Sequence, residues 1–142
     1  MDDYRNSCSA LLKQINDSLE KNANNTLRAD DMTMSQIAVL IALDQSSEKT
    51  LSMKNLQERF GVAQPTMFGT VRRLETKELV TCFLNPEDRR AKLVRLTETG
   101  KKKCDAGYVH MDDAEKQLLQ ALDGAEREQF RTLLEKIRQS LL

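Results

Sequence analysis

The residues of this chain that could carry chemistry are charged side chains clustered in the middle of the sequence. Residues 72–103 contain ten Lys or Arg and five Asp or Glu, a net charge of +5, although the whole chain is neutral. Here Arg89 and Arg90 directly follow Glu87 and Asp88 in a polar segment typical of a turn. A local excess of positive charge indicates an anion-binding surface. The alternative is a solvated turn with an ion pair worth about 0–1 kcal/mol.

Other kinds of chemistry lack the residues they need. His110 is the only histidine, and Cys8, Cys82 and Cys104 are widely separated, with no Cys-x-x-Cys pair. This pattern favours neither a structural zinc site nor a disulfide framework, and it is typical of a reducing compartment. The sequence has no Gly-rich phosphate loop, no nucleophile–base pair and no paired catalytic acids. We therefore expect no catalytic residues, no metal site, no cofactor and no enzymatic activity.

The sequence has no feature of a membrane or secreted protein. No apolar run approaches the roughly 18 residues of a membrane span. The first residues, MDDYRNSCSALLKQ, are acidic and lack the basic segment and apolar block of a signal peptide. We therefore expect a cytoplasmic protein without a membrane partner. With 39% apolar and 31% charged residues over 142 positions, one folded core is expected.

The spacing of apolar residues predicts a mainly helical fold. The polar run at 22–25 predicts a loop, and Thr33 followed by Gln36 predicts a capping box at a helix start. Helices are expected over residues 4–19, 33–43, 52–60, 64–78 and 97–122, with a last helix from the Asp-Gly break at 123–124 to the C-terminus.

Two of these helices predict a helix-turn-helix. Gly61 ends the helix at 52–60, and only GVA separates it from the next helix, which has Pro65 in its first turn. The β-prone runs at 79–84 and 92–96 follow, with a polar turn between them, and predict a hairpin. The expected fold class is therefore mainly α with a small β-hairpin wing: a winged helix-turn-helix plus a helical dimerisation region.

The order and spacing of these pieces resemble the MarR family of bacterial transcriptional regulators. The segments that carry the resemblance are MTMSQ (32–36), QPTMFGTVRRLETKELV (64–80), DRRAK (88–92) and LTETG (96–100). The resemblance implies a homodimeric regulator of transcription, more often a repressor, that binds double-stranded DNA at a pseudo-palindrome. It implies three parts: an N-terminal dimerisation helix and linker at 1–32, a winged helix-turn-helix DNA-binding domain at 33–100, and C-terminal dimerisation helices at 101–142.

The resemblance assigns DNA contacts to the helix at 64–78 and to the wing. Met67, Val71 and Leu74 form one apolar stripe, which leaves the opposite face to enter a major groove about 12 Å wide. In the family the wing tip reaches the minor groove, and Asp88 would orient Arg90 there by a charge-assisted hydrogen bond. The candidate DNA-binding residues are Gln64, Pro65, Thr66, Phe68, Gly69, Arg72, Arg73, Asp88, Arg89, Arg90 and Lys92.

Phe68 and Gly69 depart from the family pattern, in which a small polar residue is usually followed by an arginine. Phe68 could contact a thymine methyl group or fold back onto the core. Glycine in mid-helix costs about 1 kcal/mol against alanine. The target sequence therefore does not carry over from relatives. A winged-helix protein-interaction module that does not bind DNA is the alternative function.

The resemblance also implies a switch. Relatives commonly release DNA when a phenolic or other small anionic effector binds, in a pocket whose residues the sequence does not identify. Another branch of the family senses oxidants through a cysteine in the first helix, where Cys8 lies. Because Cys8 shares an apolar stripe with Leu11 and Leu12, we expect a buried structural thiol, with oxidant sensing as the alternative. Cys82 and Cys104 are expected to be packing residues.

Overall fold

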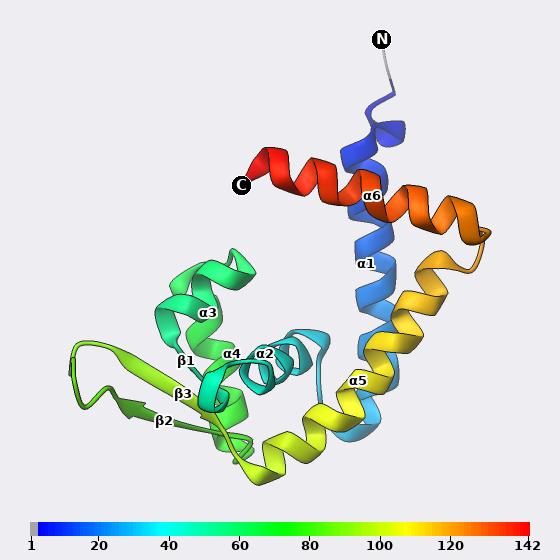
Figure 1. Cartoon of the computed structure of the whole chain (residues 1–142). Helices are drawn as coiled ribbons and strands as arrows, with labels where there is room; N and C mark the ends of the chain where they lie inside the picture. The colour runs from blue at the N-terminus through cyan, green and yellow to red at the C-terminus, as the bar shows by residue number, and fades with distance from the viewer. Residues whose placement is uncertain (1–2) are drawn as a thin grey trace. The chain divides into compact units, whose positions relative to one another are not determined.

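The computed structural model describes residues 3–142 and contains two compact units (Figure 1). One unit joins the described part of Met1–Leu19 to Met111–Leu142, and the other runs from Glu20 to His110. The elements confirm the predicted fold class, which is mainly α with a small antiparallel sheet. None of the helices within residues 3–142 has the length and apolar character of a membrane span.

The helices and strands follow one another in an order typical of a winged helix. The α-helices are α1 (Cys8–Leu27), α2 (Met34–Asp44), α3 (Met53–Phe60), α4 (Gln64–Thr76), α5 (Glu98–Leu119) and α6 (Gly124–Leu141). The strands are β1 (Thr50–Ser52), β2 (Val80–Leu84) and β3 (Lys92–Leu96). Short 3-10 turns are η1 (Tyr4–Asn6), η2 (Arg28–Asp30) and η3 (Ser47–Lys49).

Helix α1 is longer than the sequence predicts. The expected loop at 22–25 is helical, so that prediction was wrong. The Asn24 side-chain oxygen accepts a hydrogen bond from the Met34 backbone N–H at 2.7 Å, and Leu27 at the end of the helix is only 1% exposed. These tertiary contacts outweigh the weak helix propensity of asparagine.

The capping residues of the next helices confirm their predicted starts and stops. The Thr33 hydroxyl accepts the Gln36 N–H at 3.3 Å, and the Gln36 side chain accepts the Thr33 N–H at 3.3 Å, which completes the capping box of α2. The Ser52 hydroxyl accepts the Asn55 N–H at 3.0 Å at the start of α3. Gly61 ends α3 in the left-handed region with φ of 60°, a conformation that favours glycine.

The sheet has three strands, whereas the sequence predicts only the hairpin of β2 and β3. The strand order is β1-β3-β2, and both pairs are antiparallel. In the added pair, Thr50 lies opposite Arg95 and Ser52 opposite Leu93. A strand of three residues is too short for an alternating apolar pattern, which explains why β1 was missed. It attaches the wing to the helix-turn-helix, because β1 leads directly into α3.

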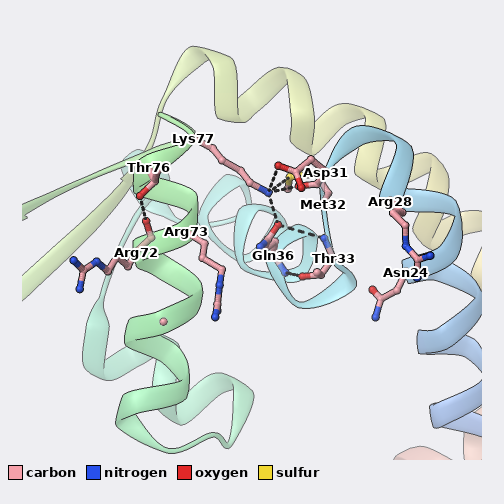
Figure 2. Close-up of a pocket in the computed structure, with 11 residues that line it drawn as sticks. Asn24, Arg28, Asp31, Met32, Thr33, Gln36, Arg72, Arg73, Thr76 and Lys77 are labelled. Carbon is pink, nitrogen blue, oxygen red and sulfur yellow. Dashed lines mark hydrogen bonds and ion pairs between the residues drawn. The ribbon is translucent and has the colours of Figure 1, made fainter.

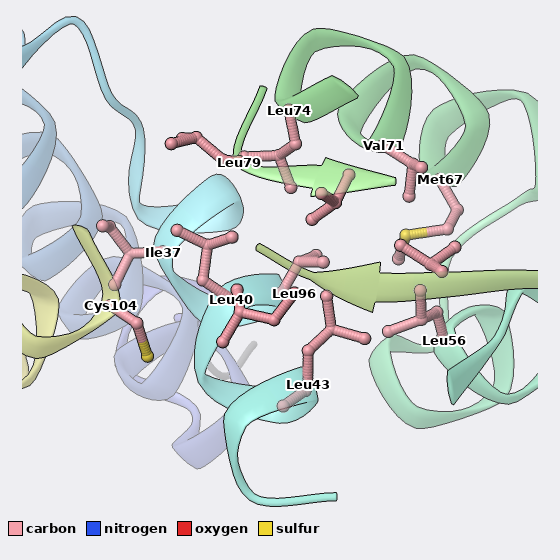
Figure 3. Packing of buried hydrophobic residues seen from close by; sticks show 14 of the residues in the cluster. Ile37, Leu40, Leu43, Leu56, Met67, Val71, Leu74, Leu79, Leu96 and Cys104 are labelled. Carbon is pink, nitrogen blue, oxygen red and sulfur yellow. The ribbon is translucent and has the colours of Figure 1, made fainter. Parts of the chain in front are cut away.

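The hydrophobic core lies within the Glu20–His110 unit, where α2, α3 and α4 pack against one face of the sheet (Figure 3). Leu40 of α2, Leu56 of α3 and Leu74 of α4 are each 0% exposed. Met67 and Val71 are buried with Leu74, which confirms the predicted apolar stripe of α4. Burial of this stripe turns the opposite face of α4 outward.

The start of α5 is fixed against Glu78 and Leu79, the residues that directly precede β2. The Thr97 hydroxyl donates to the Glu78 carbonyl at 2.8 Å and accepts the Gly100 N–H at 2.9 Å, which confirms the predicted cap. A Cβ atom on Gly100 would overlap the Leu79 carbonyl oxygen, so no larger residue fits there. Helix α5 ends at Leu119, three residues earlier than predicted.

The other unit leaves much apolar surface uncovered in the single chain. Leu11, Leu12 and Ile15 of α1 are 44%, 42% and 41% exposed. Leu133 and Ile137 of α6 are each 50% exposed. Soluble monomers seldom expose contiguous apolar patches larger than a few hundred Å². These apolar side chains are available for contact with another surface.

Candidate nucleic-acid interface

The outward face of α4 begins at a helix end without a side-chain cap. The N-cap residue, Ala63, has no group that could bond the first-turn N–H groups, which carry the positive end of the helix dipole. Gln64, Pro65 and Thr66 are exposed in this turn. These three predicted residues therefore lie together at a surface where a helix N-terminus can face an anion.

Phe68 lies at the surface between α4 and the wing. It is 36% exposed, so it does not fold back into the core. The Lys92 ammonium group lies 5.5 Å from the centre of the Phe68 ring, which is a cation–π distance. Lys92, predicted as a phosphate contact, is itself exposed at the start of β3. The pair joins α4 to the wing through their outward side chains.

Gly69 lies next to the side chain of Arg73. A Cβ atom on Gly69 would lie 3.4 Å from Nη1 of Arg73, so this guanidinium lies back over the preceding turn. Arg72 and Arg73 are exposed, and neither forms an ion pair among residues 3–142. Both guanidinium groups are therefore available to an external anion.

The wing tip holds Arg90 through Asp88. Asp88 Oδ1 accepts the Arg90 backbone N–H at 3.2 Å and Arg90 Nε–H at 3.3 Å. The Ala91 N–H donates to the Asp88 carbonyl at 2.9 Å, which closes the turn. The Arg90 side chain is 94% exposed, and Arg89 is exposed beside it. The carboxylate thus orients the guanidinium in the way expected for the Asp-x-Arg pattern, with its end left free.

A cleft of about 750 Å³ separates α4 from the end of α1 and the start of α2 (Figure 2). Its lining residues are Asn24, Arg28, Asp31, Met32, Thr33, Gln36, Gly69, Arg72, Arg73, Thr76 and Lys77. Only Gly69, Arg72 and Arg73 of these were predicted as site residues. No signal in the sequence connects the other residues to α4, because folding alone brings these distant segments together.

Comparisons with known proteins identify the family. A model of the MarR family matches residues 32–92. The HTH-type transcriptional regulator YwoH of Bacillus subtilis, which is uncharacterised, is 33% identical over 123 residues, which cover 84% of this chain and 88% of YwoH. The chain belongs to the MarR family.

Solved structures share the fold of this MarR-family chain. MepR of S. aureus, determined in complex with DNA, aligns with a TM-score of 0.85 and 27% identity over 96% of this chain and 98% of MepR. BpsR of Bordetella bronchiseptica, whose DNA binding is regulated by 6-hydroxynicotinic acid, aligns with a TM-score of 0.84 and 24% identity over 97% of each chain. At that identity the second likeness concerns the fold alone.

Family membership identifies the broad function. This chain is a MarR-family transcriptional regulator with a DNA-binding winged-helix fold. YwoH is an HTH-type transcriptional regulator, and MepR was determined in complex with DNA. The exposed face of α4 and the arginines of the wing are therefore candidate DNA contacts in a family of DNA-binding proteins.

A polar cluster around Asp44 joins the end of α2 to α5. Asp44 accepts hydrogen bonds from Lys49 Nζ at 2.7 Å, from the Tyr108 hydroxyl at 2.8 Å and from Lys101 Nζ at 3.1 Å. The bond from Lys49, helped by Tyr108 and Lys101 and opposed by burial, lowers the pKa of Asp44 to about 2. Burial, followed by the bond to Asp44, raises the pKa of Tyr108 to about 12. Lys101, one of the basic residues of 72–103, is thus paired with a carboxylate of the same chain.

The three cysteines occupy different environments. Cys104 is fully buried, as predicted for a packing residue. Cys82 is half-buried, and burial together with nearby Glu75 raises the pKa of its thiol to about 11, which keeps it protonated. Cys8 is exposed in the single chain, contrary to the predicted burial, because nothing within that chain covers the apolar stripe of α1.

Proposed function

We propose that this MarR-family chain is a repressor that binds a pseudo-palindromic operator as a homodimer. In this proposal the N-terminal half of α4 enters the major groove, where Gln64 and Thr66 reach base edges or phosphates. Arg90 enters the minor groove, where an inserted arginine meets enhanced negative potential. The observation that carries the proposal is that the free arginine held by Asp88 and the exposed, uncapped end of α4 belong to one compact unit.

The remaining predicted contacts have a role in this arrangement. Arg72 and Arg73 lie further along α4 and would contact the backbone beside the groove, while Arg89 and Lys92 would contact phosphates near the wing. Arginine is well suited to this role because its planar guanidinium matches two phosphate oxygens. The DNA-binding domain would comprise residues 33–100, between dimerisation segments at 1–32 and 101–142.

Support for a homodimer comes from the apolar surface of the unit that contains α6. Leu133 and Ile137 expose half of their area in the single chain. A second copy would bury such surface, at roughly 25 cal/mol per Å² removed from water. Light scattering should give twice the 16.2 kDa of one chain. Ile137→Glu should shift the mass to that of a monomer; a monomeric parent protein would contradict the proposal.

DNA recognition is tested first by selection from a random duplex library with reduced protein at about physiological salt. We expect enrichment of a pseudo-palindrome with half-site centres about 10 bp apart, the spacing of one helical turn. Arg72→Glu, which places a negative charge on the outward face of α4, should enrich no sequence and serves as a control. A folded parent dimer that enriches nothing, even after refolding to remove any bound ligand, would contradict DNA recognition and favour the interaction module.

An effector of the small aromatic anion class would release the operator. The support is a likeness in fold to BpsR, whose DNA binding is regulated by 6-hydroxynicotinic acid. Titrating the protein–operator complex with a panel of aromatic carboxylates and phenols at constant ionic strength should weaken binding with at least one compound. A panel that leaves the affinity unchanged throughout would contradict an effector of this class.

A further inference from the structure

We propose that the cleft beside α4 binds the backbone of one DNA strand and that Arg28, outside the helix-turn-helix, is a phosphate contact. This inference rests on the proposed DNA binding and extends its footprint to the junction of α1 and α2. Arg28 begins η2 and lines the cleft together with Arg72 and Arg73 of α4. No family motif in the sequence includes it.

The charge of the cleft favours an anion. Its lining includes Arg28, Arg72, Arg73 and Lys77, and the only acid is Asp31. Asp31 Oδ2 lies 3.7 Å from Lys77 Nζ, so these two charges offset each other. Three guanidinium groups remain, and none of them forms an ion pair among residues 3–142.

The walls of the cleft are held in place by hydrogen bonds that use none of the three arginines. Lys77 Nζ donates to the Gln36 side-chain oxygen at 3.1 Å and also to the Asp31 carbonyl oxygen. Gln36 is only 5% exposed, so this bond ties the end of α4 to a buried side chain in the first turn of α2. Asn24 is tied to the start of α2 through Met34. The cleft is therefore preformed, which limits the entropy lost on binding.

The arginines stand on both sides of this cleft. Figure 2 shows Arg73 extending from α4 and Arg28 extending from the opposite wall, with Thr33 and Gln36 between them. Among residues 3–142, the only hydrogen bond of the Arg28 side chain runs from Nη2 to Asn25 Oδ1 at 3.3 Å. A weak bond of this kind between exposed groups leaves the Arg28 guanidinium free to turn toward a phosphate.

The chemistry favours a DNA backbone over a small effector. Pockets for small molecules enclose most of the ligand and are lined mainly by apolar and aromatic side chains. This cleft is open, and Met32 is the only large apolar side chain in its lining. It also adjoins the outward face of α4, where the phosphates beside an occupied major groove would pass. Half to two-thirds of protein–DNA hydrogen bonds go to phosphate and sugar.

The salt dependence of operator binding tests the contact. For B-DNA, log K falls with log salt at a slope of about −0.9 per neutralised phosphate. In a dimer, Arg28→Ala removes two arginines, so the slope should become shallower by about 2. Binding at 0.15 M salt should weaken roughly 10–30-fold, and the loss should be the same for the operator and for an unrelated duplex. Arg28→Lys should restore most of the slope because it keeps the charge. Fluorescence anisotropy of labelled duplexes, with salt varied about sixfold between 50 and 300 mM, measures the affinity and the salt slope of the parent and of both variants.

The controls separate failure of this contact from failure of DNA binding. Lys13→Ala removes one exposed charge from α1, the helix that precedes η2, outside the cleft, and should leave slope and affinity unchanged. Unfolding and dimer mass of Arg28→Ala should equal those of the parent. If the parent binds the operator and Arg28→Ala has the same salt slope as the parent, the phosphate contact is overturned. It is also overturned if Arg28→Ala loses affinity for the operator but not for the unrelated duplex. A parent that binds no duplex overturns the proposed function itself.

Discussion

Asp88 Oδ1 accepts both the backbone N–H and the side-chain Nε–H of Arg90, at 3.2 and 3.3 Å. This double contact orients the guanidinium at the wing tip while 94% of the side chain stays exposed. We predict that Arg90→Ala weakens operator binding by about 1–3 kcal/mol and leaves the dimer intact, because Arg90 is not part of the hydrophobic core. Fluorescence anisotropy measures the affinity, and light scattering measures the mass.

Asp88→Ala provides the matched comparison for the wing. It should cost less than Arg90→Ala, about 1 kcal/mol or below, because it loosens the arginine without removing its charge. The double variant should bind no more weakly than Arg90→Ala alone, since Asp88 acts through Arg90. If Arg90→Ala binds operator as tightly as the parent, the minor-groove role of the wing is wrong.

Gly69→Ala should separate stability from DNA affinity. The missing side chain leaves space for Arg73, whose Nη1 would lie 3.4 Å from an added Cβ, close to ordinary contact. Alanine is therefore accommodated, and it should raise the free energy of unfolding by up to about 1 kcal/mol through helix propensity. The same methyl group lies on the face that we propose approaches DNA, where it takes up space at the interface, so operator affinity should fall. Urea unfolding and anisotropy measure the two effects; a rise in both quantities would contradict a DNA-contacting role for this position.

Local signals explain how much of the fold could be predicted. Thr33 and Ser52 cap helices through bonds to residues three positions ahead, and Gly61 ends a helix through its own left-handed backbone conformation. The sequence therefore contains all that is needed to place them. The Asp88–Arg90 contact is local in the same way. These features place the helix-turn-helix and the wing, and with them most of the candidate DNA-binding residues.

The predictions that failed, and the candidate contact that the sequence did not reveal, depend on partners distant in sequence. Asn24 stays helical because it bonds Met34, which propensity alone does not reveal. Cys8 shares an apolar stripe that indicates burial, yet the single chain provides nothing to cover it. Arg28 has no pattern around it and joins the candidate interface only because folding places η2 opposite α4.

The Asp44 cluster predicts a stability that depends on acid pH. Asp44 has a pKa of about 2 in the folded protein, below its ordinary value near 4. A lowered pKa adds stability that is fully present above pH 4 and is lost as pH falls toward 2. Asp44→Asn should therefore cost about 1–2 kcal/mol at pH 7 and progressively less below pH 4. Urea unfolding at fixed protein concentration measures the free energy of unfolding of both proteins. The measurements run from pH 7 down to pH 2.5, roughly the range over which Asp44 gains its proton.

Asp105→Asn is the control for the Asp44 cluster. Asp105 also pairs with Lys101, at 2.9 Å, but its side chain is 57% exposed. Its replacement should change the free energy of unfolding by less than about 0.5 kcal/mol. A pH-independent difference between Asp44→Asn and the parent would show that the carboxylate charge contributes nothing and that shape alone matters.

The exposed ring of Phe68 leads us to predict a preference for thymine, which relatives without this residue need not share. Its ring is 36% exposed near the start of α4, with Lys92 over one side, so a ring edge remains to contact a thymine methyl group. Replacing that thymine by uracil removes one methyl group and should weaken parent binding by about 0.5–1 kcal/mol per half-site. Phe68→Ala should bind both duplexes equally, because the partner of the methyl group is gone. Anisotropy with the two duplexes and the two proteins forms a double-mutant cycle. If the parent and Phe68→Ala lose the same affinity when thymine is replaced by uracil, other residues of α4 must discriminate the base.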